Sequence, residues 1–415
     1  MDECQLYSAL LQLELPWKVS SVSLDPVKKV VEIYVTHEKG SKLLCPICRK
    51  ESMVYDHLKK RIWRDLDSIE FMTFIHSNPP RISCNEHGIM EAVMPWAERR
   101  SRFTVRFETR SIGMLQHMDT LNFTEIMRLS WKQTWNIIKR AVKRGRERKK
   151  DHPSIIGIDE KSYRKGHKYI TLVYDMVNNG VDYIAYDRKK RSLDEYYDTL
   201  TMEERSNIKA ISMDMWDPFM SSTMDHVPDA SSRIVFDRFH VMKHVNEAVD
   251  KTRKDENRKL KDNGIIDLNG TRYMWLYSSD NLPEKYRERF NELKRSDLLT
   301  GKAYSMKENM RNLWNSPTME EGKRYWESWY SWVMHSSVYA MKDAARMMKV
   351  HIGNIMNYFT HHITNARAEG INSKIALIEK MAFGYRNREN LKTAIYFRCG
   401  NLEFIHEPTQ KSDDP

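Results

Sequence analysis

Two acidic side chains follow apolar runs of the kind that form buried strands. Asp159 comes after residues 155–158, and Asp214 comes after residues 208–213. A buried strand that ends on an acid delivers that carboxylate to the edge of its sheet. Two carboxylates, together with the phosphate oxygens of a substrate, form a set of hard oxygen ligands that suits Mg²⁺ or Mn²⁺. The two acids are therefore candidate metal ligands.

A third acid, Glu369, lies in a segment with the pattern of an amphipathic helix. Asn365, Glu369 and Asn372 form a polar stripe at spacings of four and three residues. The apolar positions on the opposite side are Ile371, Ile375 and Ile378. Such a helix packs by its isoleucines and presents Glu369 on another face.

Three cysteines and one histidine are spaced as two pairs: Cys45 with Cys48, and Cys84 with His87. A gap of two residues lets both side chains of a pair reach one ion, and two pairs supply the four ligands of a tetrahedral zinc. Residues 62–75 alternate like a hairpin that brings the pairs together. Four protein ligands leave no open position, so this zinc would fold a small domain. The alternatives are unrelated turns with free or buried thiols, or His57 or His76 as a substitute ligand.

Residues 123–142 carry helical apolar patterns on both sides of a break near Ser130, which is a suitable N-cap. This predicts a helix-turn-helix whose second helix enters a DNA major groove, with plain helix packing as the alternative. Residues 139–150 hold eight Lys or Arg and one Glu, which suits phosphate contacts or a solvated linker. The expected DNA contacts are Lys132, Gln133, Lys139, Arg140, Lys143 and Arg144.

Residues 151–250 alternate between strand and helix patterns. The predicted order is three antiparallel strands, a helix, a strand, a helix, a strand and a long helix. This order matches the ribonuclease-H-like fold, in which the first and fourth strands are neighbours. Asp159 and Asp214 are then expected on adjacent strand ends, where two carboxylates repel each other unless a cation lies between them.

Residues 251–350 have a helical pattern that is rich in charged and aromatic residues. Trp326, Trp329 and Tyr330 share one helical face. We interpret this face as a helical core, and stacking on an unpaired DNA end is the alternative. The segment is predicted to be a helical insertion within the catalytic domain.

The composition bounds the class of protein. The chain has 415 residues and 68 Lys+Arg against 57 Asp+Glu, for a net charge of +11. This length predicts two or three domains, and the positive charge favours nucleic acid as a partner. No apolar run is long enough for a membrane helix, and the acids after Met1 are unlike a signal peptide. We therefore expect a cytosolic protein whose five cysteines form no disulfide framework.

The predicted fold class is α+β with several domains. The expected order is a zinc-binding domain (1–100), a helix-turn-helix region with a basic linker (101–150), the first part of a ribonuclease-H-like mixed-sheet catalytic core (151–250), a helical insertion (251–350), and the rest of the core with the glutamate helix and a tail (351–415).

Five segments together resemble the DDE transposases of bacterial insertion sequences, specifically the ISL-three family. The segments are residues 157–160 (GIDE), 213–216 (MDMW), 236–240 (FDRFH), 364–372 (TNARAEGIN) and 384–387 (GYRN). They occur in the order and spacing of that family. The paired cysteines, the helix-turn-helix and the insertion before the glutamate also agree, so the resemblance covers nearly the whole chain.

The resemblance implies a catalytic triad of Asp159, Asp214 and Glu369 that binds two Mg²⁺ or Mn²⁺ ions. Asp175, Asp187 and Asp217 are rivals, but none combines an apolar strand with the family context. Asp237 and His240 are expected beside the metal site or in structural hydrogen bonds. In the zinc site, His87 takes the place of a cysteine that the family commonly has.

The implied activity is cleavage of DNA at the terminal inverted repeats of the element, followed by transfer of the freed 3′-hydroxyl to target DNA. A homodimer is expected because two ends must be joined, and the resemblance places the protein at the bacterial nucleoid. Two alternatives remain: a non-catalytic DNA-binding repressor derived from a transposase, and a nuclease of the same fold that cuts without joining.

Overall fold

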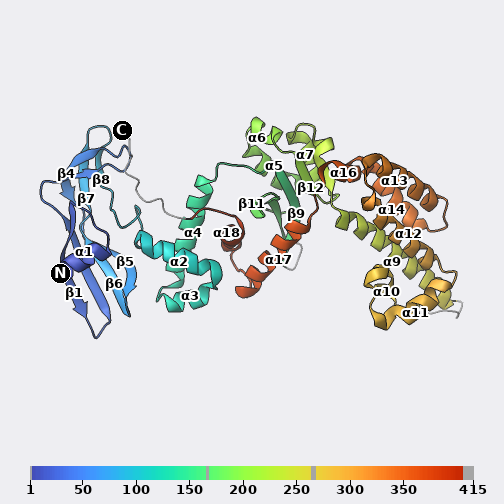
Figure 1. Ribbon diagram of the computed structural model, residues 1–415, viewed down its shortest axis with the longest axis horizontal. Coiled ribbons are helices and arrows are strands. Elements are labelled where there is room, and N and C mark those ends of the chain that lie inside the picture. Colours follow the sequence, from blue (N-terminus) through green and yellow to red (C-terminus); the bar gives the residue numbers. More distant parts are fainter. Residues whose placement is uncertain (1, 165–167, 263–267, 405–415) are drawn as a thin grey trace. The chain divides into compact units, whose positions relative to one another are not determined.

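The computed structural model describes residues 2–164, 168–262 and 268–404 (Figure 1). These residues form two compact units. The first comprises Met1–Lys149 together with Leu402–Pro415, and the second comprises Lys150–Asn401. None of the helices in the described ranges is long and apolar enough to cross a membrane.

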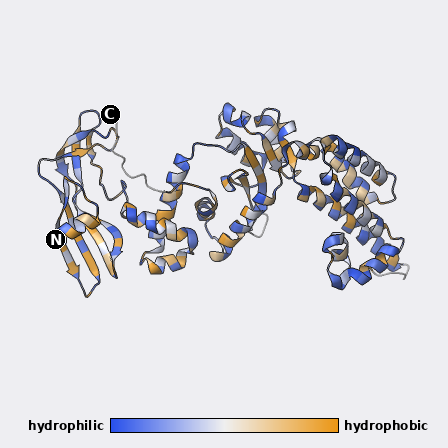
Figure 2. Cartoon of the chain, in the orientation of Figure 1, coloured by the Kyte–Doolittle hydropathy of each residue, from blue (hydrophilic) through white to orange (hydrophobic). Residues whose placement is uncertain are grey.

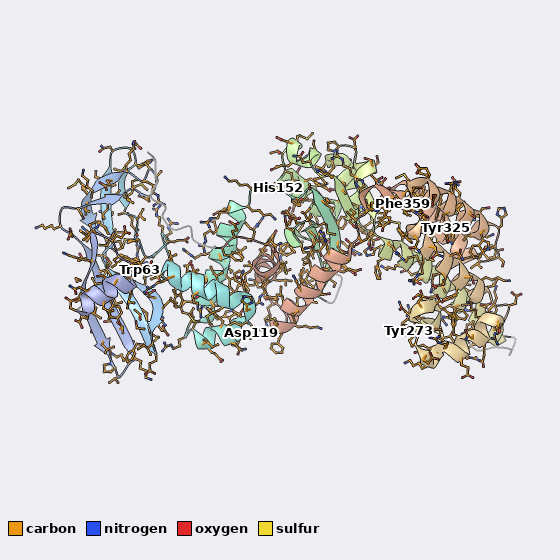
Figure 3. The ribbon with its side chains drawn as sticks, in the orientation of Figure 1. Trp63, Asp119, His152, Tyr273, Tyr325 and Phe359 are labelled. Atoms are coloured by element: carbon orange, nitrogen blue, oxygen red, sulfur yellow. The ribbon has the colours of Figure 1, made fainter. Side chains whose placement is uncertain are left out.

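The first unit begins with α1 (Glu3–Leu10), which Asp2 caps, and continues into two four-stranded sheets. One sheet has the order β1-β2-β6-β5 and is built from β1 (Trp17–Asp25), β2 (Val30–His37), β6 (Phe71–Ser77) and β5 (Arg61–Ser68). The other has the order β3-β4-β7-β8 and is built from β3 (Lys42–Leu44), β4 (Glu51–His57), β7 (Pro80–Cys84) and β8 (Gly88–Glu91). Alternate residues face the core, where Ile33, Trp63 and Ile75 are almost fully buried (Figure 3 labels Trp63).

Three helices follow in the same unit: α2 (Val105–His117), α3 (Thr120–Ile126) and α4 (Trp131–Arg148). Asp119 caps α3 (Figure 3). Ser130 caps α4, and the side chain of Gln133 bonds back to the Ser130 backbone N–H. The predicted break at Ser130 is confirmed. The basic segment is helical as far as Arg148 rather than a linker, because Ala141, Val142 and Gly145 extend the buried face of α4.

The second unit contains a five-stranded sheet with the order β11-β10-β9-β12-β13. Its strands are β9 (Ile155–Arg164), β10 (Lys168–Asp175), β11 (Gly180–Tyr186), β12 (Ala210–Met213) and β13 (Ile234–Phe236). β9, β10 and β11 pair in antiparallel fashion, whereas β12 pairs in parallel with both β9 and β13. The expected adjacency of the first and fourth strands is confirmed. The strands are largely apolar, as Figure 2 shows.

Five helices connect or follow these strands: α5 (Lys190–Asp198), α6 (Met202–Ser206), α7 (Asp217–His226), α8 (Ala230–Arg233) and α9 (Arg238–Asp262). Ile156, Ile158 and Met213 from the strands belong to one apolar core with side chains of α5, α7 and α9. One face of the sheet is therefore occupied by packing.

The predicted insertion is helical wherever it is described. After the end of α9, its elements are α10 (Arg272–Leu276), η1 (Ser279–Asn281), α11 (Glu284–Arg295), α12 (Leu299–Met310), η2 (Arg311–Asn315), α13 (Met319–Met334) and α14 (Tyr339–Val350). The helices α15 (Ile352–Met356) and α16 (Tyr358–His361) follow it. Trp326 and Trp329 are buried in the same core as the sheet, which favours the packing interpretation of the aromatic stripe. The chain then forms α17 (Ala366–Met381) and α18 (Arg388–Cys399).

Candidate functional site

Asp159 and Asp214 stand at the same level of the sheet. The parallel ladder between β9 and β12 pairs Gly157 with Ser212, and each acid lies two residues beyond its paired residue. Side chains two residues apart on a strand share a face. Asp159 therefore shares its face with Gly157. Asp214 likewise lies two residues after Ser212 of the neighbouring strand β12.

Asp237 continues the same row onto the next strand. The ladder between β12 and β13 pairs Met213 with Phe236, and Asp214 and Asp237 directly follow these residues. Asp237 is only 4% exposed. Its Oδ2 accepts a hydrogen bond from the Phe239 backbone N–H at 3.0 Å, and its Oδ1 accepts one from the Asn365 N–H at 3.1 Å. Asp237 thus ties the start of α17 to the end of β13.

Helix α17 is held to the sheet by two asparagines on either side of Glu369. The Ser212 hydroxyl donates to Asn365 Oδ1 at 3.3 Å, next to the start of the helix. Two turns later, Asn372 Nδ2 donates to Asp159 Oδ2 at 2.9 Å. Residues four and three positions apart lie on one side of a helix, so Glu369 lies on the side that Asn365 and Asn372 turn to the sheet. Its own side chain is exposed.

The carboxylate of Asp159 is oriented by two donors. Its Oδ1 accepts from the Glu160 backbone N–H at 2.7 Å, and Asn372 holds its Oδ2. The buried Tyr174 hydroxyl donates to Asn372 Oδ1 at 2.8 Å. This bond fixes the amide orientation, because the Oδ1 that accepts from Tyr174 leaves Nδ2 to face Asp159.

Burial raises the pKa of Asp159 above its ordinary value, and the nearby charge of Asp214 adds to this effect. The Glu160 N–H, His240 and Asn372 lower that pKa in part. Two neighbouring carboxylates, with oxygen atoms as ligands, suit a divalent cation. Among the described residues, Asp159, Asp214 and Glu369 do not form a close group of ligand atoms like the zinc cluster described below, and the Glu369 side chain is exposed.

The three alternative acids, Asp175, Asp187 and Asp217, have other surroundings. Asp175 accepts bonds from Val177 N, Asn178 N and the Asn178 side chain, and so shapes the turn after β10. Asp187 pairs with Lys189. Asp217 lies in the first turn of α7 and is exposed.

His240 and Asp237 are close neighbours in the first turn of α9. His240 Nδ1 lies 3.7 Å from Asp237 Oδ2, and this buried nitrogen has no hydrogen-bond partner. The charge of His240 also reaches Asp159. The imidazole therefore lies beside the row of acids.

An exposed aromatic and an arginine flank the same end of the sheet. The guanidinium of Arg188 lies 4.4 Å from the Tyr169 ring centre and 5.0 Å from that of Trp216. It also pairs with Glu160 at 2.9 Å. Sequence inspection missed this cluster, because Arg188 lies in a run of basic residues and nothing in the pattern marks its partners.

The predicted zinc ligands meet in one cluster. Cys45 and Cys48 lie in the β3–β4 turn, Cys84 ends β7, and His87 lies in the β7–β8 turn. Their ligand atoms lie within 4.8 Å of one another, with Cys45 Sγ to His87 Nδ1 and Cys48 Sγ to Cys84 Sγ both at 3.7 Å. Tetrahedral zinc with bonds of about 2.0–2.3 Å requires ligand separations of roughly 3.5–3.8 Å. The four side chains therefore fit a zinc ion.

Hydrogen bonds prepare Cys84 for a metal. The backbone N–H of Glu86, followed by His87, lowers the pKa of the Cys84 thiol to about 6. A thiolate is the form that binds zinc. His57 and His76, the possible substitutes, are outside the cluster: His57 bonds to His37, and His76 lies beside Glu32.

The predicted DNA contacts divide between two faces of α4. Arg140 and Arg144 pair with Glu98 at 2.7 and 2.9 Å and also approach the buried Glu108. Gln133 takes part in the cap of the helix. The basic side chains of the predicted set that remain exposed are Lys132, Lys139 and Lys143.

Three family models match successive parts of the chain. A zinc-finger of transposases IS204/IS1001/IS1096/IS1165 matches residues 42–87. A helix-turn-helix domain of transposase family ISL3 matches residues 93–142, and a model described as "Transposase", of the DDE type of ISL3, matches residues 156–395.

Two curated transposases are similar in sequence to this chain over most of its length. The transposase for insertion sequence element IS1001 of Bordetella parapertussis is 26% identical over 382 residues, which cover 91% of this chain and 90% of that protein. The transposase for element IS1557 of Mycobacterium tuberculosis is 26% identical over 376 residues, which cover 84% and 83% of the two chains. With the DDE model spanning more than half of the chain, and the zinc cluster, helix-turn-helix and ribonuclease-H-like sheet in place, the chain belongs to the ISL3 (ISL-three) family of DDE transposases, which are DNA-binding enzymes of insertion sequences.

Proposed function

We propose that Asp159, Asp214 and Glu369 are the three carboxylates that hold two divalent ions in this transposase. The observation that carries the proposal is the docking of α17. The Asn365 and Asn372 contacts hold this helix against the strand ends that bear the two aspartates, with Glu369 on the same side between them. An exposed side chain on that side is free to turn toward the aspartates.

Each protein group has a defined task in this proposal. Asn372 and the Glu160 N–H hold the Asp159 carboxylate in one orientation. Asp237 positions α17, and the proposed role of His240, which lies beside Asp237, is to contact DNA or the metal site. When bound, the ions lower the pKa of the attacking water or 3′-hydroxyl and stabilise the leaving oxygen. Hard carboxylate oxygens suit Mg²⁺ or Mn²⁺.

The reaction sequence follows from one site acting twice. Water first attacks the phosphodiester at the transposon end, and the bond to the 3′-oxygen breaks, which leaves a 3′-hydroxyl. The oxygen of that hydroxyl then attacks a target phosphodiester and forms a new bond to phosphorus, while the bond from that phosphorus to the target 3′-oxygen breaks and leaves a 3′-hydroxyl on the target strand. The helix-turn-helix binds the terminal inverted repeats, with Lys132, Lys139 and Lys143 on phosphates. Because the substrate is DNA, we place the protein at the bacterial nucleoid.

Strand cleavage and strand transfer on DNA that carries the inverted repeats of the element test the triad. With Mg²⁺ or Mn²⁺, Asp214→Asn should abolish both reactions and leave end binding intact. Asp217→Asn is the matched control, because it changes an exposed acid three residues away and should leave both reactions unchanged. If Asp214→Asn still cuts, the triad assignment is wrong. If the wild type cuts but never joins, the activity is that of a nuclease.

We also propose a homodimer in the complex that joins two transposon ends. Two ends must be held together before both can enter one target, and each chain has one row of catalytic acids. Light scattering on the protein with end DNA should give two chains for two ends. A complex of one chain with two ends would contradict the dimer.

A further inference from the structure

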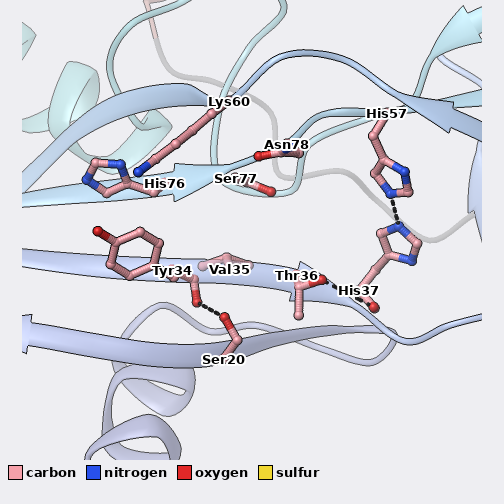
Figure 4. A pocket seen from close by; sticks show the side chains of 10 residues that line it. All are labelled: Ser20, Tyr34, Val35, Thr36, His37, His57, Lys60, His76, Ser77 and Asn78. Atoms are coloured by element: carbon pink, nitrogen blue, oxygen red, sulfur yellow. Dashed lines mark hydrogen bonds between the residues drawn. The ribbon is translucent and has the colours of Figure 1, made fainter.

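The first unit contains a pocket that the transposase chemistry does not use. It opens where two parallel strands separate (Figure 4). The ladder between β2 and β6 ends at the pair Tyr34–His76, yet β2 runs on to His37 and β6 to Ser77. The space between them has a volume of about 230 Å³, several times the roughly 30 Å³ that a water molecule occupies in the liquid.

A buried imidazole in this pocket lacks a hydrogen-bond partner. His76 is 4% exposed, and its Nδ1 makes no hydrogen bond. Its nearest acidic atom, Glu32 Oε1, lies 3.5 Å from Nε2. Burial and then the charge of Lys60 lower the pKa of His76, and Glu32 opposes this in part, so the neutral ring with one N–H donor is favoured. An N–H at Nδ1 has no acceptor in the protein, and a buried donor of this kind favours a ligand that accepts.

The pocket favours an anion over a cation. Lys60, Ser77 and Asn78 supply further donors, and no aspartate or glutamate is among the lining residues. The Lys60 ammonium lies 4.7 Å from the Tyr34 ring centre and has no acidic partner within the described part of the chain. At the far end, the Nε2 atoms of His37 and His57 bond directly to each other at 2.8 Å. An ion between them would need two bonds of about 2 Å, so this pair leaves no room for a metal.

We propose that this pocket binds a phosphate group of the DNA backbone, with Lys60 as the charge and His76, Ser77 and Asn78 as hydrogen-bond donors. Backbone phosphate is the anion that a transposase meets at high local concentration, and the helix-turn-helix belongs to the same compact unit. The zinc-bearing unit thereby gains a DNA contact outside α4. Such a contact adds affinity and carries no base specificity.

The test compares two adjacent exposed lysines in the full-length zinc-loaded protein. Lys60→Ala removes the charge of the pocket, and Lys59→Ala removes an equal charge outside the lining. Binding to inverted-repeat duplex is measured by fluorescence anisotropy at several salt concentrations. Lys60→Ala should weaken binding roughly tenfold and reduce the salt slope by about 1, Lys60→Arg should restore most of the affinity, and Lys59→Ala should change little.

Two further results decide the source of the phosphate. A single methylphosphonate, scanned along the duplex, should weaken wild-type binding at each phosphate that the protein contacts. At one of these positions it should have no effect on Lys60→Ala. Equal losses for Lys59→Ala and Lys60→Ala would overturn the proposal, because they would reflect net charge alone. If inorganic phosphate raises the melting temperature of the wild type and Lys60→Ala binds DNA as tightly as the wild type, the pocket binds free phosphate and the DNA assignment is overturned.

Discussion

At the scale of single residues, the notable feature is how the Asp159 carboxylate is held. A buried tyrosine hydroxyl fixes the Asn372 amide, and the amide fixes one oxygen of Asp159. The polar stripe of Asn365, Glu369 and Asn372 was predictable from spacing alone. Its partners were not, because nothing in a linear pattern says which strand a helix will face, and Ser212 and Tyr174 look like ordinary strand residues.

Asn372→Ala should reduce strand cleavage roughly 10- to 100-fold with little change in DNA affinity, because it frees the Asp159 oxygen and leaves Tyr174 without its acceptor. Single-turnover cleavage and anisotropy measure the two quantities. Ser373→Ala is the control, since that exposed hydroxyl bonds only to the Glu369 carbonyl of its own helix. Equal cleavage by the wild type and Asn372→Ala would remove Asn372 from the site.

Asp159→Asn should not lower the thermal stability of the metal-free protein. The folded-state pKa of Asp159 is raised, so the folded protein binds this proton more tightly than the unfolded chain. Stability from this group is therefore lost as pH rises from the ordinary pKa through the raised one, and at neutral pH the buried charge is destabilising.

Differential scanning fluorimetry in a chelator, then with Mn²⁺, checks this prediction. Mn²⁺ should raise the melting temperature of the wild type and leave that of Asp159→Asn nearly unchanged, since only a state that binds the ion is stabilised. A lower metal-free melting temperature for Asp159→Asn would show that the carboxylate is a net stabilising group.

At the scale of elements, α4 separates two kinds of basic residue that look alike in the sequence. The run of eight Lys and Arg correctly predicted that basic residues cluster here. It did not predict which of these side chains form ion pairs with acidic residues of the protein itself. Glu98 and Glu108, which pair with Arg140 and Arg144, lie more than 30 residues away, on α2 and the loop before it. Long-range pairs of this kind depend on the fold and leave no local signal.

Lys139→Ala should therefore affect DNA binding, whereas Arg144→Ala should affect stability. Lys139 is exposed, so its loss should reduce the salt slope of DNA binding by about 1 and leave stability unchanged. Loss of Arg144 takes a cationic partner from the buried Glu108 and should lower the free energy of unfolding by about 2 kcal/mol. Urea unfolding and salt-dependent anisotropy measure both, and identical profiles for the two variants would contradict the division.

At the scale of the whole molecule, the order of modules follows the sequence prediction, and the sheet topology agrees with the predicted fold. The return of Glu369 after the long insertion was the least predictable step. It depends on Asn354 and Asn357, whose side chains donate to backbone carbonyls of α8 and of the first residue of β13, and on the Asp237 bond to Asn365. These bonds join residues more than 100 positions apart, which periodicity does not reveal.

Zinc removal should unfold part of the first unit and spare the second. The metal cluster belongs to the same core as Ile82 and Leu43, and binding energy at such a site is folding energy. Calorimetry should show one transition that moves to lower temperature with a chelator and another that does not. Cys84→Ser should mimic the chelator, whereas Cys4→Ser, outside the cluster, should keep zinc content at one per chain. A single transition that shifts as a whole would contradict independent units.

The segment after α18 has a consequence for the order of events during synthesis. Leu402 packs against Gly145 of α4, and the Arg144 guanidinium donates to the Phe404 carbonyl, 260 residues further along. A ribosome that has finished α4 must still make the entire catalytic unit before these contacts can form. The first unit is therefore completed only after the catalytic unit has been translated, so a nascent chain stalled just before Leu402 holds all of the catalytic unit and lacks the last segment of the DNA-binding unit.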